Sequence, residues 1–145
     1  MIDPELVRRK LCLILSDLKA LDPLVDLPLG EYVASELHKL ASERLLERIA
    51  GRMIDVNFHV VTESGSPPPK DYYDSFLEMG RLGVLPDAFS RSIASAAGLR
   101  NRLVHEYDAL DPVRVHGALA TASREVPEYV RQVEAYLSRL LADDE

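Results

Sequence analysis

The amino-acid sequence predicts an all-α fold, an up-and-down bundle of about five helices. Apolar residues recur at steps of three, four and seven along most of the 145 residues, and no alternating strand pattern continues for more than a few positions. Hydrophobic residues make up 47% of the chain and charged residues 28%, a balance typical of a folded protein rather than a disordered one. At this length we expect residues 1–145 to form a single helical domain with one core.

The N-terminal half is expected to contain two helices. The first begins at Pro4, because proline suits the first turn of a helix, and continues to about residue 21. Two prolines and a glycine then interrupt the apolar pattern and predict a loop. The second helix is the long central one, from Tyr32 to Val61, with apolar residues repeating over about three heptads.

The C-terminal half is expected to contain three more helices. Three consecutive prolines predict an extended loop, which a short helix follows within residues 71–83, with Tyr73 facing the core. A fourth helix is expected from Pro86 to Tyr107. The last helix begins after Asp111 and continues to about residue 142, and Pro127 in its interior is expected to kink or break it.

The charge of the chain limits its partners. Twenty-four acidic residues stand against 17 basic ones, which gives a formal net charge of −7. A field of this sign repels nucleic acid on average, so any nucleic-acid binding must depend on a local basic cluster. The apolar runs are too short to span a membrane, and the N-terminus lacks the features of a signal peptide. We therefore expect a cytoplasmic protein with no membrane partner.

Several common catalytic and metal-binding sites have no support in the sequence. The four histidines form no recognised metal-ligand motif with one another, with the cysteine or with carboxylates. Neither a glycine-rich phosphate loop nor a Gly-x-Ser-x-Gly turn is present. The single cysteine, Cys12, lies in an apolar run and is expected to be buried and inert. We therefore expect no metal ion and no cofactor.

One stretch of the fourth helix, RNRLVHEY, departs from a simple amphipathic pattern. Arg100 falls within the apolar stripe, so its charge must be paired or lie at a wet cleft or interface. Arg100 and His105 are about 140° apart around an ideal helix, so one straight helix cannot direct both at the same atom. Either the helix end distorts, or two copies meet about a two-fold axis. A structural alternative stays open, in which Arg100 joins a salt bridge and His105 stabilises the helix end.

A second basic pattern lies on the central helix. Arg44, Arg48 and Arg52 repeat at four-residue steps and therefore form one row. Glu43 and Glu47 are close enough in the sequence to pair with them, which favours a solvated charged face. Auxiliary contacts to phosphate groups remain the functional alternative.

The residues of the unusual stretch resemble a known signature. Arg100, Asn101, His105 and Tyr107 fit the motif R-N-x-x-x-H-x-Y, and the passage GLRNRLVHEYDALD resembles that of HEPN domains, specifically the HepT-type toxins. The similarity extends over most of the chain. It includes the central helix ending in MIDVNFHVV, the S-G-x-P-P loop and the segment YYDSFLEMGRLGVLP, in the same order.

The resemblance implies a metal-independent endoribonuclease that acts as a homodimer, with the motif lining a cleft on the two-fold axis. Arg100 and His105 match the catalytic residues of the R-x4-H-x-Y motif, and Asn101 matches the polar residue beside the arginine. In such an enzyme the 2′-hydroxyl of RNA attacks the phosphate, while the histidine moves a proton and the arginine stabilises charge. Arg102 is expected to add local positive charge at the cleft.

The resemblance also implies a partner, a minimal nucleotidyltransferase (MNT) antitoxin, in a type II/VII-like toxin–antitoxin system. Such an antitoxin can transfer AMP to the motif tyrosine, here Tyr107. The alternative function is a non-catalytic HEPN module that binds a nucleotide or the nucleotidyltransferase subunit, and in that case Tyr107 merely packs at the end of the apolar stripe. A purely structural dimerisation bundle would leave Arg100 without a purpose.

Overall fold

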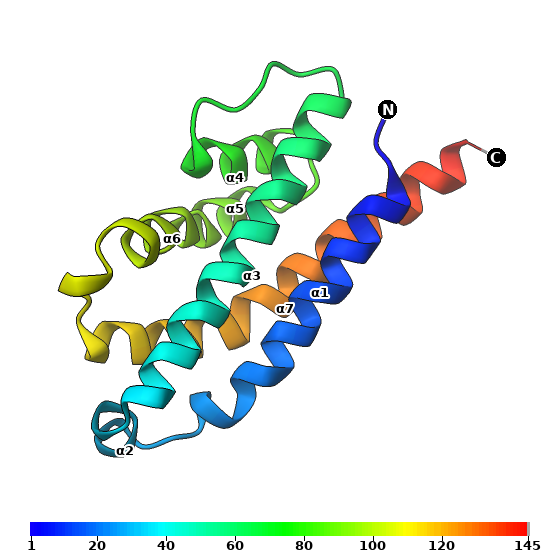
Figure 1. Cartoon of the computed structure of the whole chain (residues 1–145). Helices are drawn as coiled ribbons and strands as arrows, with labels where there is room; N and C mark the ends of the chain where they lie inside the picture. The colour runs from blue at the N-terminus through cyan, green and yellow to red at the C-terminus, as the bar shows by residue number, and fades with distance from the viewer. Residues whose placement is uncertain (145) are drawn as a thin grey trace.

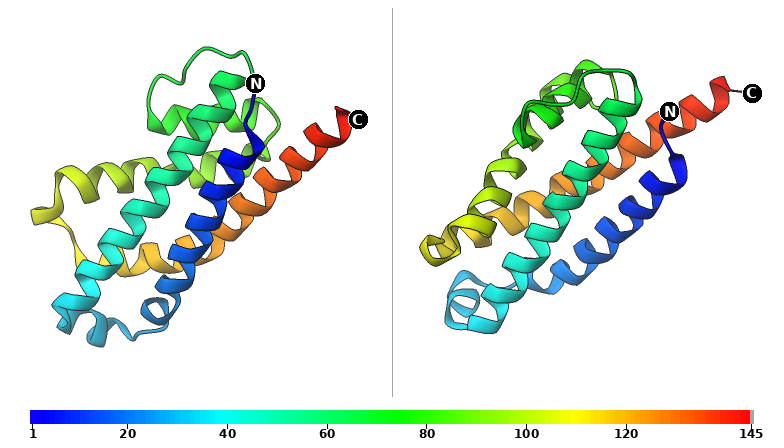
Figure 2. Two further views of the ribbon diagram at one scale, coloured as in Figure 1. Left: turned by 45° about the vertical axis from the view of Figure 1, so that its right-hand side comes forward. Right: turned by 45° about the horizontal axis from the view of Figure 1, so that its top comes forward.

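Every regular element in the computed structural model, which describes residues 1–144, is a helix (Figure 1). The elements are, in chain order, α1 (Pro4–Val25), α2 (Leu29–Ala34), α3 (Glu36–Glu63), α4 (Tyr72–Arg81), α5 (Asp87–Ile93), α6 (Ser95–His105), the 3₁₀ turn η1 (Tyr107–Ala109) and α7 (Pro112–Asp143). The long helices α1, α3 and α7 lie side by side, whereas α4, α5 and α6 form a shorter group on another side of α3 (Figure 2). The all-α prediction is confirmed.

Aspartate side chains begin three of the helices. Asp3 Oδ1 accepts a hydrogen bond from Leu6 N at 3.1 Å at the start of α1. Asp71 and Asp111 cap α4 and α7 in the same way, with N–H to Oδ1 distances of 2.6 and 3.0 Å. Each carboxylate satisfies a backbone N–H that the first turn leaves without a partner. The start signals at Pro4 and after Asp111 are therefore confirmed.

Nowhere in residues 1–144 is a helix both long and apolar enough to cross a bilayer.

The first predicted loop is wrong in its extent. The first helix continues through Pro23 to Val25, and Pro23 lies in its last turn, where the helix extends only two residues beyond the missing backbone donor. The short helix α2 occupies much of the remaining segment, and α3 begins at Glu36 rather than at Tyr32. Ser35 causes this difference, since its backbone is extended and its side chain accepts a hydrogen bond from the first turn of α3.

The predicted fourth helix is divided in two. The chain turns at Ala94, which is fully buried and whose carbonyl oxygen accepts from Ala97 N at 3.1 Å, a three-residue step that tightens the backbone. The two parts are α5 and α6, and α6 ends at His105 rather than at Tyr107.

Pro127 does not break the last helix, since α7 continues through it to Asp143. The next buried residue of α7, Tyr129, anchors that part of the helix to the core.

Two predictions of burial are also wrong. Phe76 and Met79 are fully buried in α4 as expected, but Tyr73 on the same helix is 49% exposed. Cys12 is exposed, because it lies on the solvent side of α1 between the buried residues Leu11 and Ile14. Apolar neighbours in the sequence therefore do not guarantee burial on a helix, where successive residues point about 100° apart.

A buried polar cluster joins the two groups of helices. Tyr129 Oη of α7 donates to Asn57 Oδ1 of α3 at 2.5 Å and also lies 3.1 Å from the Met53 carbonyl oxygen. Asn57 Nδ2 donates to Ser75 Oγ of α4 at 3.1 Å. Burial raises the pKa of the Tyr129 hydroxyl well above its ordinary value, so the hydroxyl stays protonated and remains a donor. All three side chains are fully buried, so each hydrogen bond replaces one to water that the fold removes.

The close approach of α4 to α5 predicts how an alanine at Gly80 changes the free energy of unfolding. A Cβ added at Gly80 would overlap Ser90 Oγ and lie 2.9 Å from Ser90 Cβ, so Gly80→Ala is expected to destabilise the fold by about 1–3 kcal/mol. Gly117→Ala is the matched control, because nothing lies within 4 Å of that position inside α7. Alanine there should stabilise the helix by about 1 kcal/mol. Chemical denaturation measures both free energies of unfolding, and equal stability of the two variants would contradict the close approach.

Candidate functional site

The candidate site residues lie at the end of α6 and in the turn that follows it. Arg100, Asn101, Arg102 and His105 are on α6, whereas Tyr107 begins the 3₁₀ turn η1. The α-helix ends because the backbone of the next residue leaves the helical region, while its N–H still bonds to the Arg102 carbonyl oxygen at 2.9 Å. Tyr107 is consequently 66% exposed, so it does not pack at the end of the apolar stripe, as the binding-module alternative expected of it.

Arg100 lies across an aromatic ring rather than against a carboxylate. Its guanidinium carbon is 5.0 Å from the centroid of the Tyr72 ring on α4, and its Nη1 donates to Asn101 Oδ1 at 3.4 Å. A guanidinium over an aromatic face is attracted by the ring and held in orientation. Among the described residues, no carboxylate forms an ion pair with Arg100. The salt bridge of the structural alternative is therefore not observed there, and the charge remains available to a ligand.

The other motif side chains are open to solvent. Asn101, His105 and Tyr107 are all exposed. His105 is the last residue of α6, and no hydrogen bond joins its ring to any other group in residues 1–144. The side chains predicted to act on a substrate are thus accessible, and none is committed to the core.

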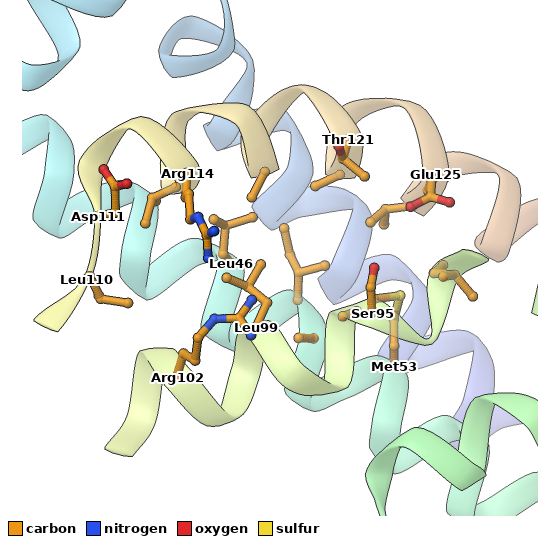
Figure 3. Close-up of a pocket in the computed structure, with 18 of the residues that line it drawn as sticks. Leu46, Met53, Ser95, Leu99, Arg102, Leu110, Asp111, Arg114, Thr121 and Glu125 are labelled. Atoms are coloured by element: carbon orange, nitrogen blue, oxygen red, sulfur yellow. The ribbon is translucent and has the colours of Figure 1, made fainter. Parts of the chain in front are cut away.

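Arg100 and Arg102 face different cavities, because positions two residues apart are rotated by about 200° around the helix axis. Arg102 lines a mostly apolar cavity of about 530 Å³ between α3, α6 and α7. Figure 3 shows its guanidinium and that of Arg114, from α7, pointing toward one another across this cavity. Arg100 lines a second cavity, of about 590 Å³, whose other residues come from α3 and α4. His105 lines neither cavity, and no hydrogen bond joins it to Arg100 in the described residues, where Arg100 bonds to Asn101 instead.

The row of arginines on α3 is divided between two roles. Arg44 pairs with Glu47 at 3.1 Å on the same helix, as the solvated-face interpretation predicts. Arg48 and Arg52 instead bind opposite oxygens of Asp17 on α1, at 3.1 and 2.6 Å. The Asp17 side chain is only 8% exposed, so its charge requires these partners.

Sequence reasoning missed three residues near the site. The signal for Asp17 was available, because it falls between the core positions Ile14 and Leu18 on the apolar side of α1. Tyr72 under Arg100 and Arg114 opposite Arg102 gave no such signal. Their positions depend on how α4 and α7 pack against α6, which helical periodicity does not determine.

Two of the three histidines outside the motif have structural contacts through their rings, whereas the buried Nδ1 of His38 has no hydrogen-bond partner in residues 1–144. His59 Nε2 accepts a hydrogen bond from Asp3 N at 3.0 Å, and His116 Nε2 lies 2.8 Å from the Leu27 carbonyl oxygen. Across residues 1–144, no group of three or more His, Cys, Asp or Glu side chains is arranged to hold a metal ion. The motif residues Arg100, His105 and Tyr107 offer a guanidinium, an imidazole and a phenol at one end of α6.

Comparison with known proteins identifies the family. A family model described as Ribonuclease HepT-like matches residues 14–134, which include the whole motif and both cavities. A curated relative from Aphanizomenon flos-aquae (strain 2012/KM1/D3), named tRNA nuclease HepT, is 37% identical over 139 residues, covering 96% of this chain and 95% of the relative.

Solved structures with the same fold are more distant in sequence. YutE, a cytosolic protein of unknown function from Bacillus subtilis, superposes with a TM-score of 0.83 at 17% identity, covering 97% of this chain and 94% of YutE. A tri-AMPylated HEPN toxin of Shewanella oneidensis, solved in complex with MNT antitoxin, has a TM-score of 0.82 at 18% identity, covering 92% of this chain and 99% of the toxin. With the family model and the curated relative, the likeness extends from sequence to fold, and the chain belongs to the HepT-like ribonuclease family.

Proposed function

We propose that this HepT-like ribonuclease is the toxin of a type II/VII-like toxin–antitoxin system and cuts RNA internally without a metal ion. The observation that carries the proposal is the state of Arg100, which is held over Tyr72 and has no carboxylate partner in residues 1–144. A cation oriented in this way and left without a counter-ion suits a phosphate group. The exposed His105 on the same helix supplies a group that can move protons.

The reaction uses the nucleophile that RNA itself carries. The 2′-oxygen attacks the adjacent phosphorus, the bond from phosphorus to the 5′-oxygen breaks, and a 2′,3′-cyclic phosphate remains. His105 exchanges the proton that the 2′-hydroxyl loses or the 5′-oxygen gains, and Arg100 stabilises the added negative charge on the phosphorane oxygens. Asn101 supports the Arg100 guanidinium through its amide oxygen, and Arg102 adds positive charge nearby.

The active form is a homodimer of two identical domains, each formed by residues 1–145. Arg100 and His105 point about 140° apart from one helix, so a single copy does not direct both at one phosphate. A two-fold axis near the end of α6 would bring Arg100 of one copy to His105 of the other. The exposure of His105 in a single copy supports this arrangement, because nothing in residues 1–144 of its own chain covers it.

Transfer RNA is the first substrate to test, because the curated relative is named a tRNA nuclease. The site of action would be the cytoplasm, where the cell keeps its RNA. The net charge of −7 makes binding dependent on the few arginines near α6, so affinity should fall as salt screens them.

An MNT-type antitoxin would neutralise the enzyme by transferring AMP to Tyr107. The solved HEPN toxin of Shewanella oneidensis is tri-AMPylated in its complex with MNT antitoxin, which supports the same pairing here. Tyr107 is 66% exposed and its hydroxyl makes no hydrogen bond within residues 1–144, so it is accessible to a modifying enzyme. An added AMP two residues from His105 would repel the RNA phosphate and obstruct the site.

The ribonuclease proposal predicts that the protein cleaves RNA in the absence of metal ions. In excess chelator the purified protein should cut tRNA or bulk cellular RNA and leave 2′,3′-cyclic phosphate ends. Arg100→Ala and His105→Ala should each reduce the rate by about a hundredfold or more. Arg44→Ala is the matched control, since Arg44 is exposed and its ion pair is with Glu47 on the same helix.

Thermal denaturation should show that each variant is folded. Wild-type protein that carries no AMP by intact mass, yet is as inert as the variants on many RNAs, would contradict the proposal. The non-catalytic binding module would then replace it.

The antitoxin proposal predicts modification at one tyrosine. With an MNT partner and ATP, the wild-type protein should gain the mass of AMP and lose its ribonuclease activity, whereas Tyr107→Phe should gain none. Tyr73→Phe should be modified like the wild type, because Tyr73 is an exposed tyrosine away from the motif. Intact-protein mass spectrometry measures both, and covalent modification of Tyr107→Phe would show that the site is elsewhere.

A further inference from the structure

The second cavity of the candidate site lies beside Arg100. It opens between α3, α4 and α6, has a volume of about 590 Å³, and is here called the Arg100 hollow. Its lining residues are Arg48, Gly51, Arg52, Ile54, Asp55, Phe58, Tyr72 and Arg100. One of them is the arginine proposed to bind the scissile phosphate, so the hollow is continuous with the candidate active site.

The Arg100 hollow is cationic although the protein is acidic. Three arginines line it together with one carboxylate, Asp55, which pairs with Lys10 of α1 at 3.1 Å. Asp17 is the carboxylate that binds Arg48 and Arg52. Counted with these ion-pair partners, the hollow has four cations and two carboxylates, an excess of two positive charges in a chain of net charge −7. This is the local basic cluster that nucleic-acid binding by so acidic a chain requires.

The two arginines of α3 are more than Asp17 needs. Arg52 makes the shorter contact with Asp17, at 2.6 Å, and its side chain is 22% exposed. Arg48 contacts the other carboxylate oxygen at 3.1 Å and is 41% exposed, so solvent or a ligand can reach it. A single arginine would neutralise the formal charge of Asp17. The second leaves a net positive charge at the surface of the hollow.

The Arg100 hollow also contains an aromatic platform. The Tyr72 ring packs edge-on against Phe58, with ring centroids 6.1 Å apart, and lies below the Arg100 guanidinium. Tyr72 is 36% exposed, so part of its surface remains open. Aromatic rings and guanidinium planes beside cationic side chains are the surfaces on which bases of single-stranded nucleic acid stack.

We propose that the Arg100 hollow binds a nucleotide of the RNA strand next to the bond that is cut, with its base on Tyr72 and its phosphate at Arg48 and Arg52. The proposal rests on RNA being the substrate of this site. It adds a binding subsite to the two motif residues that carry the chemistry. Arg48 and Arg52 lie one helical turn apart, so both reach the same side of the hollow.

RNA binding to a protein that cannot cut tests this subsite. His105→Ala serves as the parent, and fluorescence anisotropy measures the Kd of a labelled single-stranded RNA at several salt concentrations. Adding Arg48→Gln should weaken binding by about three- to tenfold. It should also make the negative slope of log K against log salt less steep by about 0.7, the share of one phosphate contact. Adding Arg44→Gln should leave both unchanged, because Arg44 is on the same helix outside the hollow.

A comparison of Tyr72→Leu with Arg48→Gln separates base stacking from phosphate binding. Tyr72→Leu should weaken binding of the RNA by about tenfold and weaken binding of an abasic oligonucleotide of equal length less, since the RNA loses base stacking as well as the support that the Tyr72 ring gives Arg100. Arg48→Gln should weaken both ligands. Asp55→Asn should strengthen both, because it removes a negative charge from the hollow, and loss of a merely structural contact would not increase affinity.

The outcomes distinguish the subsite from the proposed function. If the parent binds RNA but Arg48→Gln and Arg44→Gln have the same affinity and salt slope, the Arg100 hollow does not hold a phosphate. If the parent does not bind RNA even at low salt, the ribonuclease proposal fails and the subsite with it. Arg48→Gln leaves Arg52 on Asp17 and should fold; if it does not, an unchanged affinity in Asp55→Asn would overturn the subsite.

Discussion

The position of the candidate site depends on one buried amide, the side chain of Asn57. From the middle of α3 it accepts a hydrogen bond from Tyr129 and donates one to Ser75, which fixes α7 and α4 against the central helix. Ser75 Oγ in turn donates to the Tyr72 carbonyl oxygen at 2.6 Å, and the Tyr72 ring supports Arg100. A buried amide without these partners would cost about 1–3 kcal/mol. The core therefore sets the orientation of the arginine through a continuous series of contacts.

The geometry of α6 divides the motif between separate surfaces. Arg100 lies in the cationic hollow beside α3, Arg102 faces the apolar cavity beside α7, and His105 is exposed at the helix end. In the proposed dimer this division is an advantage, because each copy contributes an arginine to one site and a histidine to the other. Such an enzyme is inactive as a single copy. A modification at Tyr107, next to the exposed His105, would then affect a site that both copies form.

The sequence was sufficient for features that depend on neighbours along one helix. The capped starts of α1 and α7 and the helical identity of the long segments follow from such local patterns. It was insufficient where packing between helices decides. The turn at Ala94 depends on burial of that residue between α5 and α6, and the ion pairs of Asp17 depend on α1 lying beside α3. Tyr107 was expected to be helical, but α6 ends two residues before it.

The central claim is that Arg100 of one copy acts with His105 of another, and a mixed dimer tests it most directly. Arg100→Ala and His105→Ala chains carrying different tags are co-expressed, and the heterodimer is isolated through both tags. Each parent homodimer should be inactive, but the heterodimer should recover about half of the wild-type ribonuclease activity, because one of its two shared sites is intact. A heterodimer as inert as either parent, beside an active wild-type dimer, would show that both residues act within one copy.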